Sequence, residues 1–371
     1  MFVNGHTVIQ WMDEFAPKHL AMEGDRIGLQ VGTLNKPIKK VMVTLDVLEE
    51  VVDEAVEQGV DLIIAHHAVI FRPLTHLRTD LPAGKLYEKL IKHDIAVYIA
   101  HTNLDVTVGG INDLMAEALG LQQTEPLDIL YTEQLKKIVV FVPETHHEQV
   151  LEAMSNAGAG WIGNYSHCSF QVSGTGTFLP REGSQPFLGS QGNLERVAEI
   201  RIETIVTPAI QNRVIKSMLK AHPYEEVAYD IYPVEQPGQS YGLGRIGHLE
   251  KELTLSEFSS LVKEAFDVKG VRVVGDLTRK IKKVAVLGGD GNRYVSKAIF
   301  KGADVLVTGD VYYHTAHDAM AAGLSLVDPG HNVEKIMKHA IQQMLQKKIK
   351  DQKQQTEVVI SHINTDPFTF L

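Results

Sequence analysis

Short apolar runs alternate with longer amphipathic segments in the first third of the chain, and this alternation restricts the fold more than any other feature. The apolar runs lie at 39–47, 60–67 and 95–105, and the amphipathic segments at 48–59 and 83–94. Apolar residues that continue through a strand without alternation indicate burial on both faces, which is typical of a parallel sheet covered by helices. The order therefore predicts a β-α-β-α-β unit of the α/β class.

The same pattern returns after Lys282, which indicates an internal duplication. Apolar runs at 282–290, 303–310 and 324–332 alternate with helical segments, and a closing strand is expected at 356–363. When the two regions are aligned without a gap, Val41, Gly59 and Asp61 match Val284, Gly302 and Asp304. We therefore expect two pseudo-repeated α/β halves that face each other and form one domain.

A different pattern separates the two halves. Its expected order is strand, helix, two strands, helix and strand, which is the ferredoxin-like β-α-β-β-α-β motif. The stretches LQQTEPLD (121–128) and EQPGQSYGLG (235–244) at its borders contain the Gly, Pro and polar residues of turns and linkers. We therefore predict an inserted α+β domain at 128–237, between halves at 1–127 and 238–371.

Composition and charge argue against several classes of protein. The 371 residues carry a formal net charge of -10, which disfavours a nucleic-acid binder because such affinity comes from clustered Lys and Arg. The single cysteine, Cys168, permits no internal disulfide, and the first residues lack the basic and apolar regions of a signal peptide. No apolar run is long enough for a membrane-spanning helix. We therefore expect a cytoplasmic protein without a membrane partner.

Two adjacent histidines, His66 and His67, follow the apolar run LIIA at the carboxyl end of the second expected strand. Ligands of open α/β sheets collect at the carboxyl ends of strands. The alternative, one imidazole hydrogen-bonded in the core and one exposed, stays open on this stretch alone. A second pair, His146 and His147, opens an amphipathic helix, where we expect solvated side chains.

Two further strand ends add donors of the same kind. One delivers His101 and Asp105, and the other delivers His331 and Glu334, which are three residues apart and share a helix face. Imidazole and carboxylate groups together are the donors that a borderline divalent metal prefers, and two metals can share and activate a hydroxide. We predict two divalent metals, with zinc first and iron, manganese or cobalt also accepted. The predicted ligands are His66, His67, Asp105, His331 and Glu334.

Several other residues at strand ends have more than one reading. His101 is a ligand, a residue that orients a ligand, or a general acid close to the metals. Asp46, Asp310 and His314 either orient water or substrate, or serve as caps and loop hydrogen-bond partners. The glycine turn at 288–292 is either a tight turn or a contact for a substrate phosphate.

Several short stretches, taken in order, carry a resemblance to a known family. They are GLQVG, TLDV, LIIAHH, HTNLD, VAVLGG, VLVTGD and DPGHNVEK. Together they resemble the GTP cyclohydrolase I type 2 family, also called the Nif-three-like family, over about residues 1–127 and 238–371. The insert, through AHPYEEVAYDIYPV, is similar to the P-II-like domain of the longer bacterial members.

The resemblance implies a dinuclear metal site at the same five residues and a homohexamer in the form of a toroid. It also implies hydrolytic opening of the imidazole ring of GTP by a metal-bound hydroxide, with release of formate and with His101 as the candidate proton donor. A hydrolase acting on GTP, a related purine or a phosphorylated metabolite is therefore the first hypothesis. The second is a metal-dependent sensor or scaffold that acts through the P-II-like insert. A toroid threaded by nucleic acid is a third, which the acidic charge disfavours.

Overall fold

The computed structural model describes all 371 residues, which divide into two compact units. Unit 1 contains Met1–Tyr131 and Tyr241–Leu371, and unit 2 contains Thr132–Ser240. Two long strands, β7 (Gln122–Pro143) and β10 (Tyr229–Thr254), each have residues in both units. The chain therefore passes between the units within strands.

The first half of unit 1 contains a sheet with the strand order β15-β4-β5-β6-β2. Strands β4, β5 and β6 are parallel, β15 extends them in parallel, and β2 pairs antiparallel with β6. The closing strand β15 thus completes the first sheet and not the second, and it covers the edge of β4 that would otherwise be unpaired. The strands are β2 (Gly28–Val31), β4 (Lys40–Thr44), β5 (Leu62–Ala65), β6 (Ala96–Ile99) and β15 (Glu357–Ile360).

The second half of unit 1 repeats this arrangement. Strands β12, β13 and β14 are parallel and adjacent, while β11 pairs antiparallel with β14 and β10 pairs antiparallel with β12. In both halves, therefore, three consecutive parallel strands are followed by one antiparallel strand at the edge. The new strands are β11 (Arg272–Val274), β12 (Lys280–Asp290), β13 (Val305–Gly309) and β14 (Ser325–Asp328).

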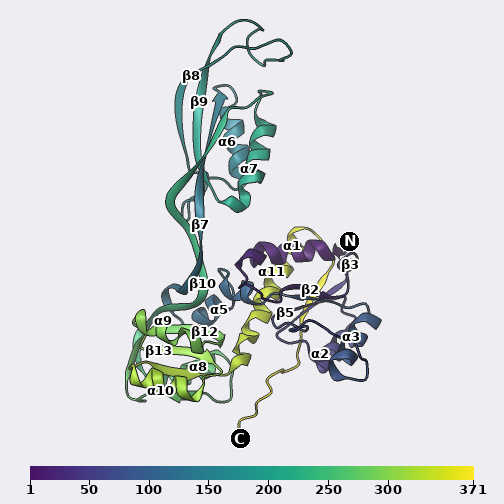
Figure 1. Ribbon diagram of the computed structural model, residues 1–371, viewed down its shortest axis with the longest axis vertical. Helices are drawn as coiled ribbons and strands as arrows, with labels where there is room; N and C mark the ends of the chain where they lie inside the picture. The colour runs from purple at the N-terminus through teal and green to yellow at the C-terminus, as the bar shows by residue number, and fades with distance from the viewer. The chain divides into compact units, whose positions relative to one another are not determined.

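Three layers of apolar side chains explain why these strands are apolar throughout. Helices α2 and α3 pack on the outer face of the first sheet, and α9 and α10 pack on the outer face of the second. The inner faces of both sheets share one core with α1, α5, α8 and α11, and Figure 1 shows α11 between the two halves. The helices are α1 (Gly5–Phe15), α2 (Glu49–Glu57), α3 (Pro82–Lys92), α5 (Ile111–Ala118), α8 (Leu255–Ala265), α9 (Val295–Phe300), α10 (Tyr313–Ala321) and α11 (Met337–Asp351).

Short elements complete unit 1. They are β1 (Val3–Asn4), β3 (Pro37–Ile38), α4 (Thr102–Val106) and the 3₁₀ turns η1 (Lys18–Leu20), η2 (Asn292–Tyr294) and η3 (His331–Ile336). Strands β1 and β3 pair antiparallel as a small separate sheet. None of the helices in either unit has both the length and the apolar character that spanning a membrane requires.

Unit 2 has the element order β-α-β-β-α-β. Between β7 and β10 lie α6 (His147–Asn156), β8 (Ser169–Phe178), β9 (Glu195–Val206) and α7 (Pro208–Ala221). Strand β9 pairs antiparallel with both β7 and β8, and the sheet order is β10-β7-β9-β8. Helices α6 and α7 cover one face of this sheet (Figure 1), where Ile200 and Ile202 lie in the core. Since side chains alternate along a strand, Glu199 and Arg201 face the other side.

The borders of the insert are paired strands and not linkers, so that part of the sequence interpretation is wrong. Residues 122–128 lie in β7, and residues 235–244 lie in β10, its neighbour in the sheet. The glycines that suggested a linker are required by the close approach of the two strands. A Cβ atom at Gly242 would overlap the backbone oxygen of Asp128, and one at Gly238 would lie 3.0 Å from the backbone oxygen of Glu133.

A buried ion pair ties α5 to β10 in unit 1. The guanidinium of Arg245, whose residue is only 3% exposed, donates to both carboxylate oxygens of Asp113. It also donates to the carbonyl oxygens of Gly242 and Gly244. Removing one partner of such a pair leaves the other partner and the carbonyl groups without a donor.

We expect Arg245→Ala to lower the free energy of unfolding by about 3–5 kcal/mol, because it leaves the partly buried carboxylate of Asp113 without its cation. The matched control is Lys92→Ala, which removes an exposed pair with Glu88 and is expected to cost at most about 1 kcal/mol. Urea denaturation followed by circular dichroism measures both. Equal losses in the two variants would contradict this account of Arg245.

Candidate metal centre

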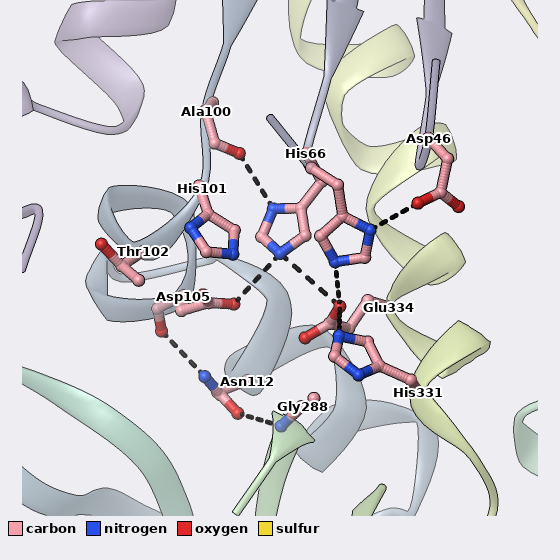
Figure 2. A network of polar contacts seen from close by, with 12 residues as sticks. Asp46, His66, Ala100, His101, Thr102, Asp105, Asn112, Gly288, His331 and Glu334 are labelled. Atoms are coloured by element: carbon pink, nitrogen blue, oxygen red, sulfur yellow. Dashed lines mark hydrogen bonds and ion pairs between the residues drawn. The ribbon is translucent and has the colours of Figure 1, made fainter. Parts of the chain in front are cut away.

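Four imidazoles and two carboxylates converge where the carboxyl ends of the parallel strands of both halves meet. Figure 2 shows five of these side chains pointing toward one another, those of His66, His101, Asp105, His331 and Glu334. From the first half, His66 and His67 follow β5, His101 follows β6, and Asp105 lies on α4. From the second half, His331 and Glu334 lie on η3, directly after β14. The chain thus brings together residues from two separate parts of the sequence.

His66 presents an unshared electron pair to two buried oxygens. Its side chain is fully buried, and its Nδ1 donates to the carbonyl oxygen of Ala100 at 2.9 Å. Nε2 then lies 3.8 Å from Oδ1 of Asp105 and 3.6 Å from Oε2 of Glu334. Burial lowers the pKa of His66 to about 3, so the ring is neutral at neutral pH and Nε2 is an acceptor.

Two of these facing acceptors are without a partner. Neither Nε2 of His66 nor Oδ1 of Asp105 has a hydrogen bond, and both atoms are buried. Buried acceptors without a donor are rare, because their lost hydration is not replaced. A cation between them would satisfy both, and a nitrogen with a carboxylate oxygen is a donor set that divalent metals accept.

His67 and His331 are held in matching ways. Nδ1 of His67 donates to Oδ1 of Asp46 at 2.6 Å, and its Nε2 lies 3.1 Å from Oε2 of Glu334. Nδ1 of His331 donates to Oδ2 of Asp310 at 2.7 Å, and its Nε2 lies 3.3 Å from the same Oε2. A carboxylate behind an imidazole fixes its orientation and makes its far nitrogen a better metal ligand.

The charges of these groups are strongly coupled. Burial opposes protonation of His67, but its hydrogen bonds with Asp46 and Glu334 outweigh burial and raise its pKa to about 10. The hydrogen bond with Glu334 raises the pKa of His331 to about 9, against the effect of burial. Burial works against ionisation of Glu334 too, yet the surrounding imidazoles keep its pKa below the usual range. Burial, followed by the charge of Glu334, raises the pKa of Asp105.

His101 is oriented by a third carboxylate. Its Nδ1 lies 2.8 Å from Oδ1 of Asp25, so that Nε2 is turned away from Asp25. The other oxygen of Asp25 accepts from the backbone N–H and the hydroxyl of Thr102. Burial would raise the pKa of Asp25, but the hydrogen bonds from His101 and Thr102 lower it overall. Asp25 is therefore a fixed negative charge behind the imidazole.

The backbone leaves room for these side chains. A Cβ atom at Gly289, whose φ is 63°, would lie 2.8 Å from Oε1 of Glu334. One at Gly288 would lie 3.0 Å from the same oxygen, so the two glycines make space for the carboxylate. Asn112 accepts from the N–H of Gly288 and donates to the carbonyl oxygen of Asp105, which joins the two halves beside the site.

Three sets of donor atoms, each within 4.8 Å of one another, could hold a metal ion. Glu334 belongs to two of them, and the third contains His101. The sets are His66 with Asp105 and Glu334, His67 with His331 and Glu334, and His66 with His67 and His101. The donor types and their spacing therefore fit divalent metal ions.

The structure brings all six predicted site residues into this cluster and sorts the remaining candidates. Asp46 and Asp310 hydrogen-bond to the imidazoles of His67 and His331, a role that neither sequence interpretation, as partners of water or substrate or as caps, had given them. His314 is exposed beside Tyr313 and lies outside the cluster. Asp25 and Asn112 were not singled out from the sequence, since no spacing links them to the groups that they contact.

The chain is similar throughout its length to known proteins. A model of the Duf34/NIF3 (NGG1p interacting factor 3) family matches residues 3–367. A Halalkalibacterium halodurans protein named GTP cyclohydrolase 1 type 2 homolog is 59% identical over 368 residues, covering 99% of each chain. A Bacillus subtilis protein of the same name is 59% identical over 369 residues, covering 100% of this chain and 99% of the relative. A crystal structure of a Bacillus cereus protein related to NIF3 matches with a TM-score of 0.95 and 58% identity, covering 100% of both chains.

We expect metal binding to release protons and to become tighter as the pH rises from about 6 to 9. The pKa values of about 10 for His67 and about 9 for His331 mean that both rings are positively charged at neutral pH. Each ring must lose the proton on Nε2 before that nitrogen can bind a metal. Each displaced proton strengthens apparent affinity by up to about tenfold per pH unit. Zinc titration calorimetry of chelator-treated protein, in buffers of different ionisation heat, counts these protons.

The control for this measurement is His314→Ala, which changes an imidazole outside the cluster and should leave the proton count unchanged. Asp310→Asn removes one group that raises the pKa of His331, and should reduce the proton count. An affinity that is the same at pH 6.5 and 8.5 would show that these imidazoles do not bind the metal.

Proposed function

Because the chain belongs to the Duf34/NIF3 family, we propose that it is a dinuclear metal-dependent hydrolase. The observation that carries this proposal is the pair of buried, unpartnered acceptors, Nε2 of His66 and Oδ1 of Asp105, which face each other beside Glu334. The two buried atoms face each other with no hydrogen bond to either, an arrangement that a metal ion bound between them would stabilise.

Two of the three donor sets describe the proposed metal positions. His66, Asp105 and Glu334 would hold one divalent ion, and His67, His331 and Glu334 would hold the other, so that Glu334 is shared. Zinc is the first choice for such nitrogen and oxygen donors, and iron, manganese and cobalt are accepted by the same set. Metal ions held there would supply Lewis acidity and lower the pKa of bound water.

The other side chains position these ligands and move protons. Asp46 keeps Nε2 of His67 directed at Glu334, and Asp310 does the same for Nε2 of His331. His101 is the proposed proton carrier, since its Nδ1 is held by Asp25 and its Nε2 is left to exchange a proton with water or with a leaving nitrogen. Asp25 therefore fixes the orientation of the imidazole and leaves Nε2 as the nitrogen that faces the other site residues.

We propose GTP or a related purine as the substrate. The support is the name of two relatives, GTP cyclohydrolase 1 type 2 homolog, which are 59% identical to this chain over almost its whole length. Hydrolytic opening of the guanine imidazole ring suits the site chemically. Attack on a ring carbon at neutral pH needs an activated water, and the nitrogen released by ring opening needs a proton donor.

The proposal extends to assembly and to the insert. The family resemblance supports a homohexameric toroid in the cytoplasm, and the hydrodynamic mass of the purified protein tests that assembly. The β-α-β-β-α-β order of unit 2, with sheet order β10-β7-β9-β8, supports a P-II-like insert. Such an insert would add ligand recognition to the metal-binding unit.

Glu334→Gln should abolish formate release from GTP and reduce the metal content of the purified protein. The neutral amide keeps the size of the side chain but removes the charge that both donor sets share. Elemental analysis and a formate assay, run on the same preparations, measure the two quantities, and His314→Ala is the control. Unchanged turnover in Glu334→Gln would refute the hydrolase, whereas two metals without formate in the wild type would remove GTP as the substrate.

His101→Gln separates proton transfer from metal binding. If His101 carries a proton, this variant should lose about 100-fold or more in kcat while keeping the metal content of the wild type. A loss of metal that parallels the loss of turnover would instead make His101 a ligand. Asp25→Asn should lower kcat less, because it leaves the imidazole in place and removes only the charge behind it.

A further inference from the structure

The insert contains a cavity of about 330 Å³ that lies wholly within unit 2. It lies at the sheet face opposite helices α6 and α7, where Glu199 of β9 and Phe141 of β7 face away from the core. Its size is that of a small-molecule site. The residues that give it chemical character are Phe178, Phe187, Tyr224, Glu199, Glu225 and Arg181.

A carboxylate is buried in this cavity without a counter-ion. Glu199 lies on the central strand β9 and is only 8% exposed. Its one polar partner is the hydroxyl of Tyr224, which donates to Oε1 at 2.9 Å. A Glu side chain is rarely this buried unless it is paired with a cation, because burial removes part of the hydration of the carboxylate.

The nearest histidine does not supply the missing charge. Nε2 of His222 donates to the carbonyl oxygen of Phe141, and its Nδ1 accepts from the N–H of Tyr224. These two bonds together require the neutral ring, because a proton on Nδ1 would face another N–H group. Burial also lowers the pKa of His222. The carboxylate of Glu199 therefore stays without a positive partner inside the unit.

The local backbone is adapted to the position of this carboxylate. Gly176 on β8 lies against it, and a Cβ atom there would overlap Oε2 of Glu199. On the open side, aromatic rings surround the cavity. The ring centroid of Tyr224 lies 5.8 Å from the ring centroid of Phe178 and 6.4 Å from that of Phe187. Aromatic faces attract cations, most strongly where water is excluded.

The charges at the mouth of the cavity also favour a positive ligand. Glu225 and Glu226 line it in addition to Glu199, and Arg181 is the one basic residue of the lining. Arg181 is exposed and forms no ion pair with Glu199. The combination of an unpaired carboxylate, aromatic walls and a net negative lining selects against anions and for cations.

We propose that this cavity of the insert binds a small organic amine, with the ammonium group at Glu199 and the apolar body against Phe178, Phe187 and Tyr224. The site is independent of the metal centre, since all of its residues belong to unit 2. An ammonium group supplies the donor and the positive charge that Oε2 of Glu199 lacks. The rings bind the rest of the molecule and exclude water from the ion pair.

The first test compares two probes of equal size on the full-length protein. Benzylamine is positively charged at neutral pH, whereas benzyl alcohol is neutral and can still donate one hydrogen bond. Titration calorimetry should show one benzylamine bound per chain, and benzyl alcohol bound at least about tenfold more weakly. Equal affinity for the two probes, or binding of neither, would overturn the proposal.

Variants locate the binding to the cavity. Glu199→Gln removes the charge but keeps an oxygen for Tyr224, and should weaken benzylamine binding at least about tenfold. Its control is Glu203→Gln, a neutralisation on the same strand and face at a residue that is already paired with Lys137 and Arg201. Unchanged binding in Glu199→Gln, or an equal loss in Glu203→Gln, would contradict the assignment.

A further variant decides the matter if Glu199→Gln does not fold. Phe187 is 49% exposed, so Phe187→Ala should leave the fold intact. It removes one aromatic wall and should weaken benzylamine binding several-fold without changing metal content. Benzylamine affinity equal to that of the wild type would show that the rings do not surround the ligand.

Discussion

The shared carboxylate of Glu334 is the point on which the arrangement of unit 1 depends. Its Oε2 lies within 3.6 Å of three imidazole nitrogens, two from the first half and one from its own turn. These groups come from the carboxyl ends of strands in two different sheets, so the geometry exists only if both halves keep a fixed relation. One continuous apolar core between the sheets supplies that relation.

Polar contacts at the boundary refine what the core positions. Asn112 of α5 connects the backbone of Asp105 to that of Gly288. The next residue of α5, Asp113, accepts from Arg245 of β10. The glycines beside Glu334 make space that any side chain would fill. Burying several ionisable groups in such a small volume is unfavourable unless charge is compensated, which metal ions or protons on the imidazoles can do.

Much of this architecture could be predicted from the sequence, and the missing parts have physical reasons. Three apolar runs are each followed closely by a histidine, namely His66, His101 and His331. This pattern indicates parallel strands whose carboxyl ends carry the metal-ligating side chains. The role of Asp25 was not predictable, because its contact with His101 spans a long stretch of chain without periodicity. The glycines of β10 suggested linkers, since local composition does not reveal a neighbouring strand that requires a residue without a side chain. For the same reason nothing in the sequence pointed to the carboxylate of Glu199, which looks like any surface acid on an alternating strand.

Anomalous X-ray scattering from crystals grown with zinc would show whether Glu334 is shared between two metal ions. We expect two peaks per chain on either side of the Glu334 carboxylate, one beside His66 and Asp105 and the other beside His67 and His331. A single peak would leave Glu334 as a ligand but remove its shared role. No peak at this cluster, in crystals that bind zinc elsewhere, would show that these residues do not form a metal site.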